Sequence, residues 1–266
     1  MLSPFPIDAS RRARFLGCPV DLYDRQETLA LIERAIRRRQ RLQHVVINVA
    51  KLVAMRKDAD LHRDVSGSDL INIDGMGVVW GARLLGLPVT ERVAGADLMM
   101  DVLRLCEAQG FRPYFLGARP EVLETFVSGL RTRLPRLDIA GWRDGYFGKA
   151  EEPAIAAAIR GARADCLFIA ISSPIKENFL HAWRDAMDVP FLMGVGGTID
   201  VEAGLVARAP VWMQKAGLEW LFRLAQEPRR MWRRYLFSNT EYAFLLARAL
   251  IGRLAARPAA CEEVRS

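Results

Sequence analysis

The sequence predicts an α/β fold: a mostly parallel sheet with helices on both faces, followed by a helical C-terminal appendage. Short apolar runs alternate with helical patterns from about residue 44 to residue 193, and this alternation is typical of parallel sheets. Glycine or small polar residues follow most of these runs, as expected where strands lead into helices. After Arg208 the strand signals stop and only helical periodicity remains.

Composition is ordinary for a soluble globular protein, with 51% hydrophobic and 26% charged residues in 266. No apolar run reaches the twenty or so residues of a membrane-spanning helix, and the N-terminus lacks the apolar core of a signal peptide. We therefore expect a cytoplasmic protein. The four cysteines, at positions 18, 106, 166 and 261, form no metal-binding or disulfide pattern and are expected to be buried free thiols.

The pattern over residues 15–63 predicts two strands and two helices. The second strand is buried and ends at Asn48. Asp58 and Asp60 lie among basic residues in the following helix, so we interpret them as a solvated face rather than a metal-binding pair. The elements are an opening strand and turn (15–23), a helix (24–39), the strand (44–49) and a second helix (50–63).

A central stretch, residues 70–95, organises the chain. Its apolar strand ends at Asp74, which is followed by a turn containing Gly75 and Gly77 and then by a helix over residues 78–85. Open α/β sheets bind their ligands at the carboxyl ends of strands, so Asp74 is a candidate pocket carboxylate. The alternative is that Asp74 only caps the helix or stabilises the Asp-Gly turn.

The remaining patterns predict four further strands with their helices and then three helices alone. Lys176 and Glu177 begin the helix that follows the most apolar strand. The expected strands cover residues 112–116, 138–142, 166–171 and 190–193, and the helices cover residues 97–109, 120 onward, 151–162, 176 onward, 213–226, 228–237 and 240–256, with a frayed tail from 258.

Motifs of common hydrolases and nucleotide-binding proteins are absent: the sequence holds neither GxSxG nor a P-loop. Gly194-Val-Gly196-Gly197 follows a strand, and its backbone N–H groups could cradle a diphosphate, or it could form only a tight turn. Arg92, Lys176 and Arg208 could complete an anion site at the strand ends. A sugar-nucleotide enzyme without a metal needs such cations to stabilise the departing diphosphate, and Asp74 suits the single base of inverting glycosyl transfer.

Positive charge is concentrated at the C-terminal end. From Arg208 onward there are eleven basic and five acidic residues, which accounts for +6 of the net +7. In residues 229–236 arginines alternate with aromatic and apolar residues, a composition that fits an anionic membrane surface better than nucleic acid. An oligomer interface is a further role for these helices. The alternative to an enzyme is a non-catalytic membrane-binding or nucleic-acid-binding protein on the same scaffold.

A series of motifs in one order extends over nearly the whole chain, and on these the protein resembles the WecG/TagA/CpsF family of bacterial glycosyltransferases, glycosyltransferase family twenty-six. The motifs are Asp74-Gly-Met-Gly77, Glu91-Arg-Val-Ala-Gly95 with Asp97, Tyr114-Phe-Leu-Gly117, Gly145-Tyr-Phe147, Ser173-Pro-Ile-Lys-Glu177, Gly194-Val-Gly-Gly-Thr-Ile-Asp200, Arg208-Ala-Pro210, Gly217-Leu-Glu-Trp-Leu-Phe-Arg223 and Glu227-Pro228-Arg229.

The resemblance implies a Rossmann-like core over residues 1–207, a basic amphipathic appendage over residues 208–257 that associates with the membrane, and a frayed tail over residues 258–266. It implies transfer of a sugar from a UDP-sugar, with inversion and without metal or cofactor, to an undecaprenyl-diphosphate-linked saccharide in exopolysaccharide or cell-surface polysaccharide synthesis. The enzyme is expected to be peripheral on the inner face of the cytoplasmic membrane and not to bind nucleic acid. A homo-oligomer is also compatible with the resemblance.

The resemblance also implies roles for individual residues. Asp74 is expected to be the general base, with Asn48 and Arg92 lining the pocket. The C-terminal helices are expected to close the active site and bring Arg223, Arg230 and Arg233 to the diphosphate. The other expected substrate-binding residues are Gly95, Gly117, Lys176, Glu177, Gly196, Gly197, Asp200 and Arg208.

Two positions depart from the family pattern. Val46 replaces a Thr that commonly lies two residues before the pocket Asn, and Pro174-Ile-Lys176-Glu177 replaces Pro-Lys-Gln-Glu. The second change puts a cation where the family has a neutral amide. A cation at this position favours a phosphate or a carboxylated sugar over N-acetylmannosamine, and similar members extend a lipid-linked glucose.

Overall fold

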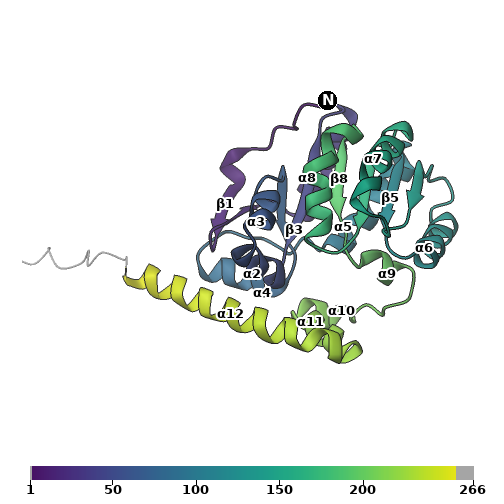
Figure 1. Ribbon diagram of the computed structural model, residues 1–266. Coiled ribbons are helices and arrows are strands. Elements are labelled where there is room, and N and C mark those ends of the chain that lie inside the picture. The colour runs from purple at the N-terminus through teal and green to yellow at the C-terminus, as the bar shows by residue number, and fades with distance from the viewer. Residues whose placement is uncertain (1, 256–266) are drawn as a thin grey trace, which may run out of the picture.

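The computed structural model describes residues 2–255, except the side chains of Arg230, Leu254 and Ala255. Six parallel strands form the main sheet in the order β4-β3-β8-β7-β5-β6 (Figure 1). The expectation of an α/β fold with a parallel sheet is confirmed. The strands are β3 (Leu42–Ile47), β4 (Leu70–Ile73), β5 (Pro113–Gly117), β6 (Gly141–Arg143), β7 (Cys166–Ala170) and β8 (Phe191–Gly194).

Helices bury both faces of the sheet. Successive side chains of a strand point to opposite faces, so each strand contributes to the core on both sides. In β7, Phe168 packs into one apolar cluster, whereas Leu167 and Ile169 pack into another on the opposite face. The first face is covered by α1 (Arg25–Arg37), α5 (Gly95–Gln109) and α6 (Pro120–Arg133). The opposite face is covered by α2 (Val49–Lys57), α3 (Ala59–Ser66), α4 (Met76–Leu84), α7 (Glu152–Gly161) and α8 (Ile175–Met187).

An antiparallel hairpin of β1 (Arg12–Phe15) and β2 (Cys18–Asp21) packs beside the edge strand β4. The buried Asp21 joins the two, because its carboxylate accepts hydrogen bonds from the Ile71 backbone at 2.7 Å and from Arg12 at 2.8 Å. Short 3-10 helices lie at Ala9–Arg11 and Lys149–Glu151. The three cysteines within the described residues are buried and free, as expected, while Cys261 lies outside them.

The expected single helix over residues 50–63 is wrong. α2 ends at Lys57, and the Asp58 side chain accepts a hydrogen bond from the Leu61 backbone at 2.9 Å, which caps the N-terminus of α3. A short polar side chain competes with the helix for backbone hydrogen bonds, so Asp58 favours a break at this position.

The C-terminal segment, residues 208–255, also differs from expectation. Residues 211–226 form two short helices, α10 (Val211–Lys215) and α11 (Glu219–Gln226), because Gly217 adopts a left-handed φ of +67° between them. The two helices expected over residues 228–237 and 240–256 are instead one continuous helix, α12 (Pro228–Ala255). Residues 256–266, with the expected tail, lie outside the described residues.

The long helix α12 passes beside α2 and α4, on the side of the molecule where α10 and α11 also lie (Figure 1). The Tyr242 hydroxyl donates to the Gly77 carbonyl at 2.8 Å, and its ring packs beside Phe15. Farther along α12, Arg253 donates to the Leu85 carbonyl. These contacts attach α12 to the helix that follows Asp74. Within residues 2–255, none of the helices combines the length and the hydrophobicity that a membrane-spanning segment requires.

Candidate active site

Asp74 lies directly after β4, at the edge of the sheet where the carboxyl ends of the parallel strands meet. Its backbone N–H donates to Ile47 of the neighbouring strand β3 at 2.8 Å. The residue that caps α4 is Gly75, with a φ of +129°, and no side chain provides a capping hydrogen bond. Asp74 therefore does not cap α4, and its carboxylate is directed elsewhere.

The segment from Arg92 to Gly95 is attached to the end of β4. Val93 N–H donates to the Ile73 carbonyl at 2.9 Å, and Gly95 N–H, at the start of α5, lies 3.4 Å from Asp74 Oδ2. A Cβ on Gly95 would lie 3.9 Å from the same oxygen, so the helix backbone closely approaches the carboxylate. Arg92 and Asp74 are thereby placed in the same corner of the site.

Burial of Asp74 favours a base that can be protonated. Burial is the largest influence and raises the pKa of Asp74 above its usual value. Arg92 and Arg223 act in the opposite direction, while the carboxylate of Glu219 adds to the rise. A carboxylate with a raised pKa binds a proton more readily, which suits general base chemistry.

Asn48 caps α2, since its Oδ1 accepts from the Lys51 N–H at 2.9 Å. A Cβ on Gly75 would lie 3.7 Å from the Asn48 side chain. Asn48 therefore lines the turn next to Asp74, and its capping bond fixes the side chain there.

A second cluster lies near the ends of β3, β7 and β8. Lys51 Nζ and Lys176 Nζ lie 2.9 Å and 3.4 Å from the same oxygen of Glu177, and the side chains of Lys176 and Glu177 are buried. Burial, followed by the charge of Lys51, lowers the pKa of Lys176 to about 8. Burial opposes ionisation of Glu177, but the two lysines together lower its pKa. Two ammonium groups sharing one carboxylate leave this corner with an excess of positive charge.

The expected glycines have different surroundings. A Cβ on Gly117 would collide with the Ala170 backbone at 2.5 Å, so this glycine permits β5 and β7 to approach closely where they end. Gly196 has a φ of +54°, and no described atom lies within 4 Å of the position that a Cβ would take. A Cβ on Gly197 would contact Asp200 of the short helix α9 (Thr198–Glu202). The loop of Gly196 and Gly197 thus follows β8, between the two clusters.

The C-terminal segment brings further charges to the same edge. Arg92 Nη1 lies 2.8 Å from Glu219 of α11, and Arg208 Nη1 lies 2.6 Å from Asp97 of α5. Arg223 of α11 is close enough to Asp74 to influence its ionisation. The expected Arg233 is not gathered here, since it is exposed and lies over the ring of its neighbour Trp232. The side chain of the expected Arg230 lies outside the described residues.

Sequence reasoning missed four residues of this site: Lys51, Gln214, Glu219 and Arg234. Of Arg233 and Arg234, it is Arg234 whose charge acts on Lys176. Glu219 belongs to a motif that the sequence analysis quoted, yet its partner Arg92 is 127 residues away, so no local pattern could pair them.

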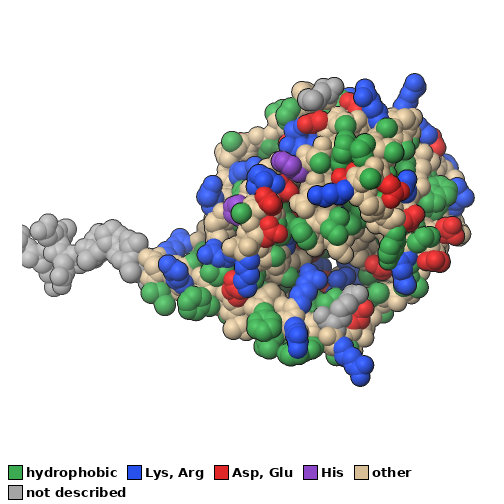
Figure 2. Space-filling view, in the orientation of Figure 1, with side chains coloured by type: hydrophobic (Ala, Val, Ile, Leu, Met, Phe, Trp, Pro, Cys, Tyr) green, Lys and Arg blue, Asp and Glu red, His purple; other side chains and the backbone are tan. Residues whose placement is uncertain are grey.

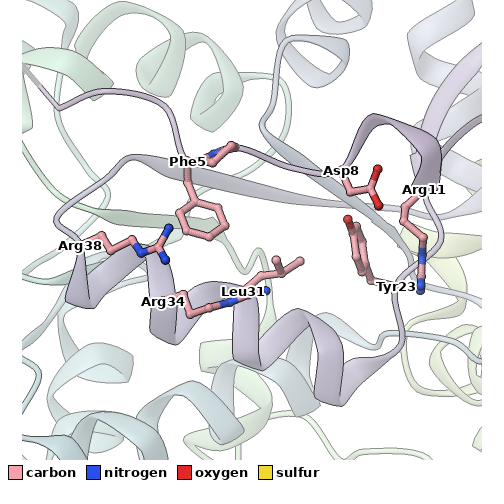
Figure 3. A pocket seen from close by; sticks show the side chains of 8 residues that line it. Phe5, Asp8, Arg11, Tyr23, Leu31, Arg34 and Arg38 are labelled. Carbon is pink, nitrogen blue, oxygen red and sulfur yellow. The ribbon is translucent and has the colours of Figure 1, made fainter.

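A hollow bordered by Lys and Arg side chains opens between the core and the C-terminal helices (Figure 2). A different hollow, of about 350 Å³, lies between α1 and the N-terminal segment, with Phe5, Arg34 and Tyr23 among its lining residues (Figure 3). None of the clustered residues at the carboxyl edge of the sheet lines this second hollow, which is therefore not the candidate active site.

Comparison with known proteins identifies the family of the chain. The Glycosyl transferase WecG/TagA/CpsF family matches residues 13–256. A relative from Bacillus subtilis strain 168, named N-acetylglucosaminyldiphosphoundecaprenol N-acetyl-beta-D-mannosaminyltransferase, is 35% identical over 197 residues, which are 74% of this chain and 75% of the relative. A protein of the same name from Bacillus spizizenii strain W23 is 36% identical over 172 residues, 65% of this chain and 66% of its own length. The chain therefore belongs to the WecG/TagA/CpsF family and is a glycosyltransferase.

Proposed function

We propose that this enzyme moves a sugar from a UDP-sugar to a polyprenyl-diphosphate-linked saccharide, with inversion and without a metal ion, in the synthesis of a bacterial cell-surface polysaccharide or exopolysaccharide. The observation that supports this most directly is the pairing of a basic carboxylate, Asp74, with three arginines, Arg92, Arg208 and Arg223, around one edge of the sheet. The printed names of the relatives, which specify a lipid-diphosphate acceptor, support the same substrate class.

In the proposed reaction, Asp74 accepts the proton of the acceptor hydroxyl. The acceptor oxygen forms a bond to the anomeric carbon as the bond from that carbon to the diphosphate oxygen breaks, and UDP leaves with the electron pair. The leaving diphosphate gains negative charge in the transition state, so the nearby guanidinium groups stabilise it more than they stabilise the bound donor. Asn48 and the loop of Gly196 and Gly197 are proposed to position the donor.

Lys176 is proposed to decide substrate preference. Its ammonium group and that of Lys51 share a single carboxylate, so one positive charge of the cluster is left for a substrate anion. A diphosphate oxygen or a sugar carboxylate would satisfy that charge, whereas a neutral acetamido group would not. The donor sugar of this enzyme is therefore proposed to differ from that named for the Bacillus relatives.

We further propose that residues 208–255 rest on the anionic inner face of the cytoplasmic membrane. Phe237, Phe244 and Ile251 are about two-thirds exposed and recur every seven residues, which places them along one face of α12. Arg233 and Arg248 fall on that same face by helical spacing and are also exposed. Aromatic and basic side chains together on an exposed helical face are typical of helices that lie in the membrane interface.

The test is a donor screen. Purified enzyme is mixed with a synthetic lipid-diphosphate-glucose acceptor and a panel of neutral and acidic UDP-sugars in EDTA, and UDP release is measured. We expect release that requires both substrates and is insensitive to EDTA. The same panel is then repeated with a lipid-diphosphate-N-acetylglucosamine acceptor. No turnover on either acceptor would contradict the proposed reaction, and turnover abolished by EDTA would contradict metal independence.

A further inference from the structure

The position of Glu219 at the active site is fixed by the packing of Gly217, two residues earlier, against α4. A Cβ on Gly217 would lie 2.7 Å from the Trp80 ring and 2.9 Å from Met76, so the backbone of the C-terminal segment lies directly on α4. Because α4 begins directly after Asp74 and Gly75, this contact places the first residue of α11, Glu219, beside the end of β4.

Arg92 is held from both its backbone and its side chain. Its neighbour Val93 is hydrogen-bonded to Ile73, and its guanidinium contacts Glu219 at 2.8 Å and Gln214 at 3.5 Å. Only 12% of the Arg92 side chain is exposed. A buried guanidinium needs a partner, so Glu219 is the group that keeps this cation in its present position when no substrate is bound.

Among the described side chains, the charged groups that act most on Asp74 are Arg92, Glu219 and Arg223. Glu219 in turn acts on Arg208 and Tyr235, and Arg208 is paired with Asp97. Arg92 alone would stabilise the ionised form of Asp74 and make it a weaker base. Glu219 offsets that charge because it lies against the same guanidinium.

On the basis of the proposed function, we propose that Glu219 is a positioning residue of this site, which holds the Arg92 guanidinium beside Asp74 and offsets its charge, so that Asp74 stays a competent base. Glu219 acts through Arg92 and Asp74 and does not itself exchange a proton with substrate. The C-terminal segment thereby completes the catalytic site electrostatically as well as covering it.

The test measures the ionisation of Asp74 directly. NMR titration of protein labelled with ¹³C at aspartate carboxyl groups follows Asp74, whose signal is identified by its loss in Asp74→Asn. In Glu219→Gln we expect the Asp74 titration midpoint to fall by about one pH unit, because Arg92 is no longer offset. Glu219→Asp keeps the charge one methylene farther from Arg92, so its midpoint is expected between those of wild type and Glu219→Gln.

Glu241→Gln is the matched control. Glu241 also lies in the C-terminal segment, is also 29% exposed and is paired with Lys57 of the core, but it is not among the charges that act on Asp74. Its loss should leave the Asp74 midpoint unchanged. A wild-type midpoint in both Glu219 variants, or an equal shift in Glu241→Gln, would overturn the proposal. Thermal unfolding of each variant shows that folded protein is being compared.

Activity provides a second, separate measurement. Since Asp74 must be ionised to act, the acid limb of the pH profile of kcat/KM is expected to move to lower pH in Glu219→Gln, with a lower plateau. The NMR titration requires no substrate. Absence of turnover on every donor would therefore count against the proposed reaction alone, whereas an unmoved midpoint would count against Glu219 alone.

Discussion

The sheet core and the C-terminal segment are stabilised by different kinds of interaction. Core helices such as α5 and α6 bury five side chains each, whereas α10 and α11 bury none. The C-terminal segment is attached by specific contacts, namely the fit of Gly217, two ion pairs with arginines and the hydrogen bond of Tyr242, and by apolar packing of α12 at Tyr242, Leu245 and Leu246. Burial of apolar area supplies most folding free energy, so most of the stability of the fold is expected to come from the core.

This difference separates stability from function. Both regions contribute charges to the active site, but the core buries more apolar surface and is expected to contribute more to the stability of the fold. Changes at the contacts between them should therefore reduce activity with little change in thermal unfolding. Changes on the outer face of α12 should affect neither the core nor the chemistry, and should act on membrane binding alone. The following experiments test that separation.

The largest effect is expected from Asp74→Asn. Loss of a general base typically lowers the rate by 10² to 10⁴, so we expect kcat to fall by roughly 10³. The pKa of Asp74 is raised by burial, which means that its ionised form opposes folding at neutral pH. The variant should thus unfold at an equal or higher temperature than wild type at pH 7, and the difference should vanish as the pH falls below the ordinary aspartate pKa. An active variant would exclude Asp74 as the base.

Gly217→Ala should break the contact between the regions. The new methyl group would collide with Trp80 and requires a φ that alanine disfavours, so α11 and its charges should move from the site. Displacement of catalytic groups by about 1 Å can cost roughly 100-fold in kcat/KM, with a small change in the unfolding temperature of the core. Gly252→Ala is the control, since a Cβ there has no neighbour within 4 Å among the described atoms. Equal activities of the two variants would contradict the closure of the site by α11.

Phe237→Glu with Phe244→Glu should test the outer face. Loss of two apolar anchors and addition of two negative charges should weaken flotation with anionic liposomes by roughly tenfold or more, while activity on a short-chain soluble acceptor is unchanged. Tyr146→Glu is the matched control, because Tyr146 is 70% exposed but lies in the core domain. If all three replacements had the same effect on flotation, α12 would not be the membrane-binding element.

Lys176→Gln should produce a smaller, pH-dependent effect on stability. The pKa of Lys176 in the folded protein is about 8, below the usual 10.5, so the unfolded chain binds more protons between these values. Wild-type stability should consequently gain with rising pH from about 8 to 10.5, relative to Lys176→Gln. Chemical unfolding of both proteins across this range measures the difference. The exposed Lys149→Gln serves as control and should track wild type; parallel curves for all three would contradict a buried, destabilised ammonium group.

The sequence alone determined the architecture. Apolar runs such as residues 166–170 predict buried parallel strands because both faces of the sheet must be covered, and that requirement repeats at every strand. Asp74 was found for the same reason: a carboxylate at the carboxyl end of a buried strand falls at the edge where such sheets bind ligands. The order of motifs identified the family, and the match over residues 13–256 confirms it.

Local signals failed where a contact between distant residues decides the conformation. The patterns around residues 213–226 favour one helix, but Gly217 breaks it in order to fit against Trp80, which lies more than 130 residues earlier in the chain. The patterns around residue 238 suggested a break, yet Ser238 is buried within α12, where its hydroxyl donates to the Arg234 carbonyl. Helix boundaries with weak intrinsic preference are settled by packing.

Only the tertiary structure decided which charges share the site. From spacing, Arg233 and Arg234 are equivalent, but the rotation of α12 leaves Arg233 on its outer face, whereas the charge of Arg234 acts on Lys176. Glu219 and Lys51 carry no sequence signal for their partners Arg92 and Glu177, which lie 127 and 126 residues away. Periodicity reports which face of an element is buried, whereas the pairing of charges depends on how whole elements are docked, and that is a property of the folded chain.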